Sequence, residues 1–197
     1  MCVMKLLDLI TSEARVRILH ELFSETNKHL YVRELTRRVG TEINAVRREL
    51  KRLTQAGLIR KERRGNRLYY LIRKDYIFYN DLVSMIAKET GIGKEIIDHQ
   101  DKLGKIKLAL LSKEYVEGRE PLENQLDLII VGTLNLELME ELVKKAKEKT
   151  QRDVNYTVMG EEEFIYLRDR KDHFLLSFLV SPNILLLGDG NKYLTLV

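Results

Sequence analysis

The chain of 197 residues contains one cysteine, Cys2, only two prolines, and no long hydrophobic run. A single cysteine excludes an intramolecular disulfide and argues against a metal site built from thiolates. The four histidines are scattered without the paired spacing of metal ligands, so we expect no structural metal and no cofactor. No apolar run reaches the roughly 18 residues that span a bilayer. The first residues also lack a signal-peptide cleavage pattern, so we expect a cytoplasmic protein without a membrane partner.

The basic residues are concentrated in the first part of the chain. The formal net charge is +4, but residues 1–75 hold 18 Lys and Arg against 9 Asp and Glu. The rest of the chain holds 16 basic against 21 acidic residues. An asymmetry of this size indicates that the first part meets a polyanion and that the second part does not. The length allows two small domains, each with a modest core.

Residues 41–56 show the pattern of one amphipathic helix. The apolar positions recur at steps of three and four and form one stripe: Ile43, Val46, Leu50 and Leu53. The positions Asn44, Arg47, Arg48 and Lys51 follow the same steps on another face, which is therefore cationic and rich in hydrogen-bond donors. Gly57 is expected to end the helix, because glycine adopts the left-handed conformation at lowest cost.

A hairpin is predicted directly after this helix. Residues 58–63 and 67–72 are β-patterned and are joined through Arg64-Gly65-Asn66. A shorter helix over residues 31–40, ending at Gly40, precedes the basic helix, and residues 29–31 are a candidate edge strand. The order helix, tight turn, basic helix and hairpin is the layout of a winged helix-turn-helix. The alternative is a solvated basic helix beside an ordinary hairpin.

In a winged helix-turn-helix the second helix enters the major groove, and the wing lies along the DNA backbone or minor groove. The residues that we expect to contact DNA lie on the basic helix and at the hairpin tip: Thr41, Asn44, Arg47, Arg48, Lys51, Arg63, Arg64 and Arg67.

Residues 6–91 resemble the winged-helix domain of arsenic-repressor-like (ArsR-like) transcriptional regulators. The stretches NAVRRELKRLTQAGLI and RRGNRLYYLIRKDYIFYNDL especially resemble the subgroup fused to a nucleotidyltransferase-like domain. The resemblance implies a regulator that binds double-stranded DNA as a homodimer. It also implies that the helix after the wing contributes to dimerisation. We therefore expect its apolar stripe, Tyr79, Leu82, Val83 and Ile86, at a dimer interface, with packing inside its own chain as the alternative.

The second half of the chain alternates strand and helix patterns, which predicts a small α/β domain and an α+β protein overall. Strands are expected over residues 106–111, 126–131, 154–159, 184–187 and 193–197. Helices are expected over residues 136–149, 161–168 and 173–180. The predicted organisation is a winged-helix domain over residues 1–75, connecting and dimerisation helices over 76–104, and an α/β domain with a mixed sheet over 105–197. Within the connection, residues 91–93 are the candidate boundary, and residues 94–103 the candidate connecting helix.

This half resembles a minimal nucleotidyltransferase domain in the stretches ENQLDLIIVG, DVNYTVMGEEEF and DHFLLSFL. In active members a Gly-Ser turn cradles the triphosphate, two acids one residue apart lie on the second strand, and a third acid lies on the next strand. Several carboxylates are needed because two divalent ions must be held. In this chain the corresponding residues are Lys113 and Glu114 in the turn, Gln125 and Asp127 as the pair, and Asn155 as the third. We therefore expect no catalytic residues and a domain that is catalytically inactive.

The leading hypothesis is a sequence-specific DNA-binding transcriptional regulator that is not an enzyme. Three roles stay open for its second domain: sensing a nucleotide without converting it, binding a partner protein, and holding the dimer together. One alternative is an active nucleotidyltransferase that uses the winged helix to bind its target. Another is an antitoxin-like module that acts through a partner protein.

Overall fold

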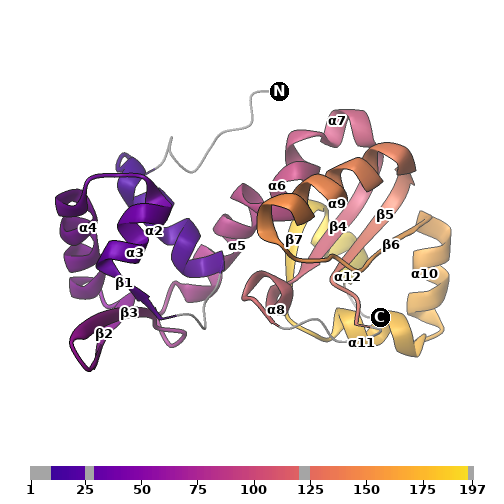
Figure 1. Cartoon of the computed structure of the whole chain (residues 1–197). Coiled ribbons are helices and arrows are strands. Elements are labelled where there is room, and N and C mark those ends of the chain that lie inside the picture. Colours follow the sequence, from indigo (N-terminus) through magenta and orange to yellow (C-terminus); the bar gives the residue numbers. More distant parts are fainter. Residues whose placement is uncertain (1–9, 25–28, 120–124, 195–197) are drawn as a thin grey trace. The chain divides into compact units, whose positions relative to one another are not determined.

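The computed structural model describes residues 10–24, 29–119 and 125–194 (Figure 1). The expected start of the first helix at residues 6 and 7 lies outside these residues, as does Cys2. The chain divides into two compact units, Met1–Ile86 and Ala87–Val197. The division falls inside helix α5 (Tyr79–Glu89), so the glycines at 91 and 93 belong to the second unit. Helices and strands are mixed, and the second sheet contains both parallel and antiparallel pairs, which confirms the α+β class with a mixed sheet.

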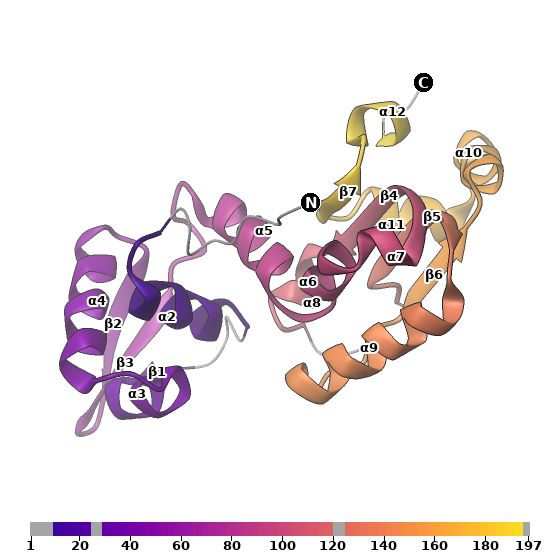
Figure 2. The same ribbon diagram turned by 90° about the horizontal axis from the view of Figure 1, so that it is seen from above.

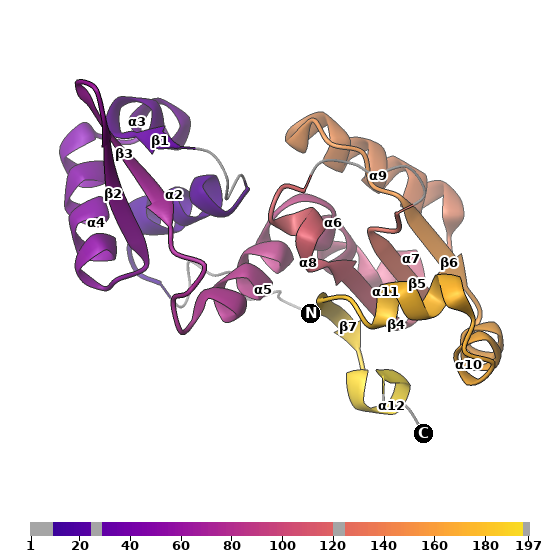
Figure 3. The same ribbon diagram turned by 90° about the horizontal axis from the view of Figure 1, so that it is seen from below.

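The first unit consists of helices and a three-stranded antiparallel sheet. The helices are α2 (Glu13–Ser24), α3 (Val32–Val39), α4 (Ile43–Gln55) and the first part of α5. The strands are β1 (Leu30–Tyr31), β2 (Ile59–Arg64) and β3 (Arg67–Ile72), in the order β1-β3-β2. The edge strand expected at residues 29–31 is thus confirmed, since Leu30 pairs with Tyr70 of β3. Figures 1 and 3 show the β2–β3 hairpin projecting beyond the helices of this unit.

Local sequence signals explain where these helices begin and end. Ser12 caps α2, because its hydroxyl accepts a hydrogen bond from the amide of Arg15 at 3.3 Å. Helix α4 ends in a Schellman motif: the amide of Leu58 donates to the carbonyl of Leu53, and that of Gly57 donates to Thr54. Gly57 has a φ of 82°, so the expectation of a left-handed glycine at this end is confirmed.

The second unit is built on a four-stranded sheet with the order β6-β5-β4-β7. Its strands are β4 (Gly104–Ser112), β5 (Leu128–Leu134), β6 (Tyr156–Met159) and β7 (Asn183–Gly188). Its helices after α5 are α6 (Gly91–Asp98), α7 (Gln100–Leu103), α8 (Lys113–Val116), α9 (Leu136–Thr150), α10 (Glu161–Asp169), α11 (His173–Leu179) and α12 (Gly190–Leu194). Strand β5 is parallel to β6 and antiparallel to β4, and β4 is antiparallel to β7.

Helices cover both faces of this sheet, as Figures 2 and 3 show for α9 and α11. On one face, Leu110 and Ile129 pack in a buried cluster with Phe164 of α10 and Phe178 of α11. Helices α6 and α9 cover the other face, whose side chains include Ala109 and Ile130. The central strands are therefore buried on both sides, which explains why they appear in the sequence as continuous apolar runs.

Two sequence expectations in this unit are wrong. The strand expected over residues 193–197 is helix α12 as far as Leu194, and residues 195–197 lie outside the described part. The cause is Asp189, whose carboxylate accepts from the amides of Asn191 and Lys192 and so starts a helix. The single connecting helix expected over residues 94–103 is two helices, α6 and α7, which are separated at His99.

Gly93 lies in a tightly packed position inside α6. A side-chain carbon there would lie 2.1 Å from the carbonyl oxygen of Ala87, so only glycine allows the end of α5 to approach α6 this closely. Within the described ranges, no helix has both the length and the apolar character needed to cross a membrane.

Candidate nucleic-acid interface and carboxylate site

The outer face of α4 is the first candidate site. The inner stripe of the helix is buried, with Val46 and Leu50 both at 0% exposure. On the opposite face the side chains of Asn44, Arg47, Arg48 and Lys51 are all exposed, and Thr41 before the helix is half-exposed. The structure therefore places the predicted residues of this helix together on one solvent-facing surface.

A buried carboxylate fixes the rotation of α4. Glu49 is 5% exposed and accepts hydrogen bonds from Arg15 of α2 at 2.8 Å and from Arg52 at 2.7 Å. Burial alone would raise the pKa of this carboxyl, but the two arginines outweigh it and lower the pKa below its ordinary value. This ion network holds α4 on α2 and so keeps the cationic residues on the outside.

The turn between α3 and α4 is short and is held by hydrogen bonds at Gly40 and Val39. Gly40 has a φ of 65° and ends α3, as the sequence predicts, with its amide bonded to the carbonyl of Thr36. Arg17 of α2 donates to the carbonyl of Val39 at 3.0 Å and so anchors this turn. Glu42 then precedes α4 without capping it, since its side chain accepts no hydrogen bond from the helix amides.

The three arginines at the hairpin tip are all exposed but differ in their contacts. Arg63 makes no ion pair with any described residue. Arg64 donates to Glu62 at 2.6 Å and contacts His29 at 2.5 Å. The guanidinium of Arg67 lies 5.1 Å from the ring centroid of Tyr31, a cation–π contact that leaves its charge unneutralised.

The helix face and the hairpin adjoin each other. Helix α4 packs against β2, and the positive charge of Arg47 acts on Tyr70 of β3, whose pKa is nevertheless raised by burial. Across the described ranges, six exposed cations of α4 and β2 have no hydrogen bond or ion pair: Arg47, Arg48, Lys51, Arg60, Lys61 and Arg63. Of these, Arg60 is near enough to Glu62 and Asp75 for its charge to help lower their pKa. An electropositive surface thus extends from the helix onto the hairpin.

The residues expected at a dimer interface are mostly covered by the chain itself. Tyr79, Val83 and Ile86 are buried, and the ring of Tyr79 stacks on Phe23 of α2 at 5.7 Å. Leu82 is half-buried. The apolar surface that remains open here lies just before α5, where Ile77 is 81% and Phe78 55% exposed.

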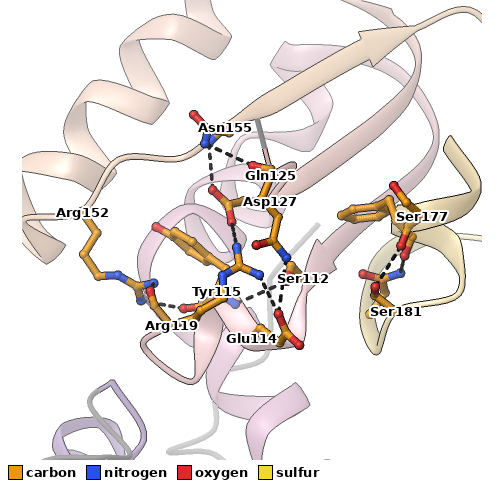
Figure 4. A network of polar contacts seen from close by, with 12 residues as sticks. Ser112, Glu114, Tyr115, Arg119, Gln125, Asp127, Arg152, Asn155, Ser177 and Ser181 are labelled. Atoms are coloured by element: carbon orange, nitrogen blue, oxygen red, sulfur yellow. Dashed lines mark hydrogen bonds and ion pairs between the residues drawn. The ribbon is translucent and has the colours of Figure 1, made fainter. Parts of the chain in front are cut away.

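The carboxylate site of the second unit lies around Asp127, immediately before β5 (Figure 4). The structure brings together the three expected positions of the acid set. One carboxylate oxygen of Asp127 accepts from the backbone amide of Asn155 at 3.0 Å. The side-chain amide of Asn155 donates to the backbone carbonyl of Gln125 at 3.1 Å. All three residues therefore meet where β5 and β6 begin.

An arginine occupies the space between the two nearest carboxylates. Arg119 donates to Asp127 at 2.8 Å and, through its other terminal nitrogen, to Glu114 at 2.7 Å (Figure 4). Arg152 in turn stacks on Tyr115 and donates to the backbone carbonyls of Tyr115 and Arg119. Arg119 thus joins the segment after β4 to the start of β5, and Arg152 joins the same segment to the stretch before β6.

Asp127 is 5% exposed, and burial raises its pKa above the ordinary aspartate value. The amide of Asn155 and the charges of Arg119 and Arg152 act in the opposite direction but do not cancel the effect of burial. Lys113 and Glu114 both lie in helix α8, which is capped by the hydroxyl of Ser112. The expected phosphate turn is therefore a helical turn with charged side chains.

This arrangement does not fit a site for two divalent ions. The two available carboxylates are bridged by Arg119, whose positive charge would repel a metal ion at the same place. Nowhere in the described parts of the chain do three or more His, Cys, Asp or Glu residues gather to hold a metal. Glu123, the nearest further acid in the sequence, lies outside the described residues.

Sequence reasoning missed the residues that organise both sites. The burial of Glu49 could not be predicted, because a charged residue beside an apolar stripe occupies the same sequence position whether its side chain is buried or exposed. Arg119 and Arg152 lie outside any periodic element, so their contacts with Asp127 and Tyr115 depend wholly on the tertiary fold.

Comparison with protein-family models, curated protein sequences and solved structures finds no match for this chain.

Proposed function

We propose that this chain is a sequence-specific DNA-binding transcriptional regulator and that its second unit is catalytically inactive. In this proposal α3 and α4 form a helix-turn-helix, α4 enters the major groove, and the β2–β3 hairpin is the wing. The DNA-contacting residues are those expected from the sequence on α4 and the hairpin tip. The protein acts in the cytoplasm and binds double-stranded DNA as a homodimer.

The observation that carries the proposal is the set of exposed cations on α4 and β2 that make no hydrogen bond or ion pair among the described residues. Arg47 and Lys51 are four residues apart on one helix, and like charges at this spacing cost a few tenths of a kcal/mol. Elsewhere in the same unit Arg15, Arg38 and Arg52 are paired with glutamates. Exposed Arg33 and Arg37 of α3 also have no hydrogen bond or ion pair among the described residues. Unpaired cations thus lie on α3, α4 and β2, the elements of the proposed helix-turn-helix and wing, as is expected of a surface that receives a polyanion.

The contacts of Arg119 support the proposal that the second unit is catalytically inactive. With both carboxylates engaged by this guanidinium, Asp127 is not free to bind a metal or to activate a hydroxyl. The alternative, an active nucleotidyltransferase, requires transfer of label from a nucleoside triphosphate that disappears in Asp127→Asn. We expect no transfer with magnesium or manganese.

The test of DNA binding begins by selecting bound fragments from a pool of random duplexes with the full chain. Affinity for the selected duplex is then measured by fluorescence anisotropy at fixed salt. Arg48→Ala should weaken binding by at least about fivefold, because each base-reading contact contributes roughly 1–3 kcal/mol. The matched control is Arg170→Ala, an exposed arginine of the second unit.

If Arg48→Ala and Arg170→Ala bind the selected duplex with equal affinity, α4 is not the recognition helix. Failure of the native chain to select any duplex would overturn the proposed function. Lys28, the loop residue that would be the simplest lysine control, lies outside the described residues, so Arg170 takes its place.

A further inference from the structure

An acidic side chain lies beside the cationic surface of α4 and has no cation as partner. Glu42 is exposed and directly precedes the helix. Its only side-chain hydrogen bond with a described residue is one of 2.9 Å from the side-chain amide of Asn44. Among the described residues Glu42 makes no ion pair, although exposed Arg47 and Arg48 follow within two turns of the helix.

The ordinary explanation for an acid at this place is stabilisation of the helix. A capping glutamate accepts hydrogen bonds from the first helix amides, but the Glu42 side chain accepts none of them. Its carboxylate is instead directed to Asn44, which belongs to the exposed face of α4. A carboxylate on a surface that meets phosphates costs binding energy unless it has a specific partner on the nucleic acid.

The hydrogen bond to Glu42 also fixes the orientation of the Asn44 amide. A carboxylate only accepts hydrogen bonds, so the amide nitrogen of Asn44 must face it and the amide oxygen must point away. One carboxylate oxygen of Glu42 and the amide oxygen of Asn44 are left as acceptors. The first turn of α4 therefore offers hydrogen-bond acceptors, whereas Arg47, Arg48 and Lys51 offer donors.

We propose that Glu42, oriented by Asn44, is a specificity-determining residue that accepts a hydrogen bond from the amino group of a cytosine in the major groove. The inference rests on the proposed function, since it assumes that α4 enters that groove. In the major groove cytosine presents an amino donor, and carboxylates are its usual protein partner. Thymine presents a carbonyl oxygen at the same place, which would face the carboxylate without a proton between them.

The operator half-site is thus expected to place a cytosine near the start of α4 and guanines near Arg47 and Arg48, because arginine pairs with the acceptor edge of guanine. Glu42 also weakens binding to every other sequence, since its charge repels phosphates where no amino group is available. It contributes more to discrimination between sequences than to affinity.

The experiment compares the full native chain with Glu42→Gln in selections from the same random duplex pool. The native chain should enrich a motif with an invariant cytosine. Replacing that C·G pair by T·A should weaken native binding about fivefold or more. Glu42→Gln should lose this preference and favour adenine there, because glutamine offers both a donor and an acceptor.

The matched control is Glu137→Gln, an exposed glutamate in the first turn of α9, which should leave the selected motif unchanged. Circular dichroism confirms that each variant is folded. If Glu42→Gln selects the same motif and keeps the fivefold preference for C·G over T·A, the role assigned to Glu42 is wrong, whereas the proposed DNA binding is unaffected. Failure of the native chain to enrich any motif would overturn the assignment together with the proposed function.

Discussion

At the scale of single residues, Arg119 decides the chemistry available to the second unit. Its guanidinium lies between Asp127 and Glu114 at hydrogen-bond distance from both, and its side chain is only 17% exposed. In this partly dry environment a fixed cation is a stronger partner for the carboxylates than a hydrated divalent ion, which gives up its water reluctantly. The charge that a metal would supply is therefore supplied by the protein itself.

The variant Arg119→Met should destabilise the chain by about 3 kcal/mol, because it leaves the buried Asp127 carboxylate without its counter-ion. Urea unfolding at neutral pH measures the change. The double variant Arg119→Met, Asp127→Asn should recover part of the loss, since removing both charges removes the unpaired one. A double variant no more stable than Arg119→Met would show that the arginine acts only by packing.

At the scale of elements, two buried glutamates join helices that are distant in sequence. Glu49 links α4 to α2 through Arg15, and Glu95 of α6 accepts from Lys145 and Lys149 of α9 at 2.7 and 2.8 Å. For both carboxyls burial opposes ionisation, but the cations outweigh it and the pKa is lowered. These contacts fix the rotation of each helix about its axis. Burial of apolar side chains alone would allow a wider range of rotations.

The two glutamates predict a loss of stability in acid. Because each folded-state pKa lies below the ordinary value of 4.5, the ionised carboxylate stabilises the fold above that pH. The contribution is lost as the pH falls through the lowered pKa. Glu49→Gln should therefore destabilise α4 by about 2 kcal/mol at pH 7 and by much less near pH 3.

Hydrogen exchange of the α4 amides at both pH values measures this difference, with Glu137→Gln as an exposed control. Equal effects of Glu49→Gln at both pH values would show that the carboxylate charge does not anchor the helix.

The same elements show how far the sequence predicts the fold. The sequence predicted the apolar stripe of α4 and the left-handed glycine that ends the helix. Both depend only on neighbouring residues: the spacing of apolar side chains and the conformational freedom of glycine. The prediction of a strand in place of helix α12 was wrong, because a short apolar run after an aspartate is compatible with either a strand or a helix. The contact of Tyr193 with Phe164 belongs to the tertiary structure and is not visible in the sequence. Gln125, Asp127 and Asn155 were expected to form one set from the resemblance to a nucleotidyltransferase domain, and the structure brings them together. The insertion of Arg119 was not expected, since a loop arginine has no periodicity.

At the scale of the whole molecule, the proposed function depends on two linked copies of the first unit. A single helix in one groove buries little surface, whereas two half-sites held by one dimer bind with an effective local concentration. Three of the four residues expected at the dimer interface are buried in the chain, so the contact surface of the proposed dimer must include other residues. Ile77 and Phe78, with half-buried Leu82, form the exposed apolar surface next to α5.

We expect Phe78→Asp to convert a dimer into monomers, because a charge buried between two copies would be desolvated without a partner. The substituted side chain is 55% exposed in the single chain, so the variant should fold normally. Light scattering measures the oligomeric state, and anisotropy should show DNA affinity reduced by at least about tenfold through loss of the second half-site.

Phe174→Asp is the matched control, since Phe174 is 49% exposed in the second unit. A dimer that persists in Phe78→Asp but dissociates in Phe174→Asp would place the interface in the second unit, and the role of that unit would then be to hold the two DNA-binding surfaces together.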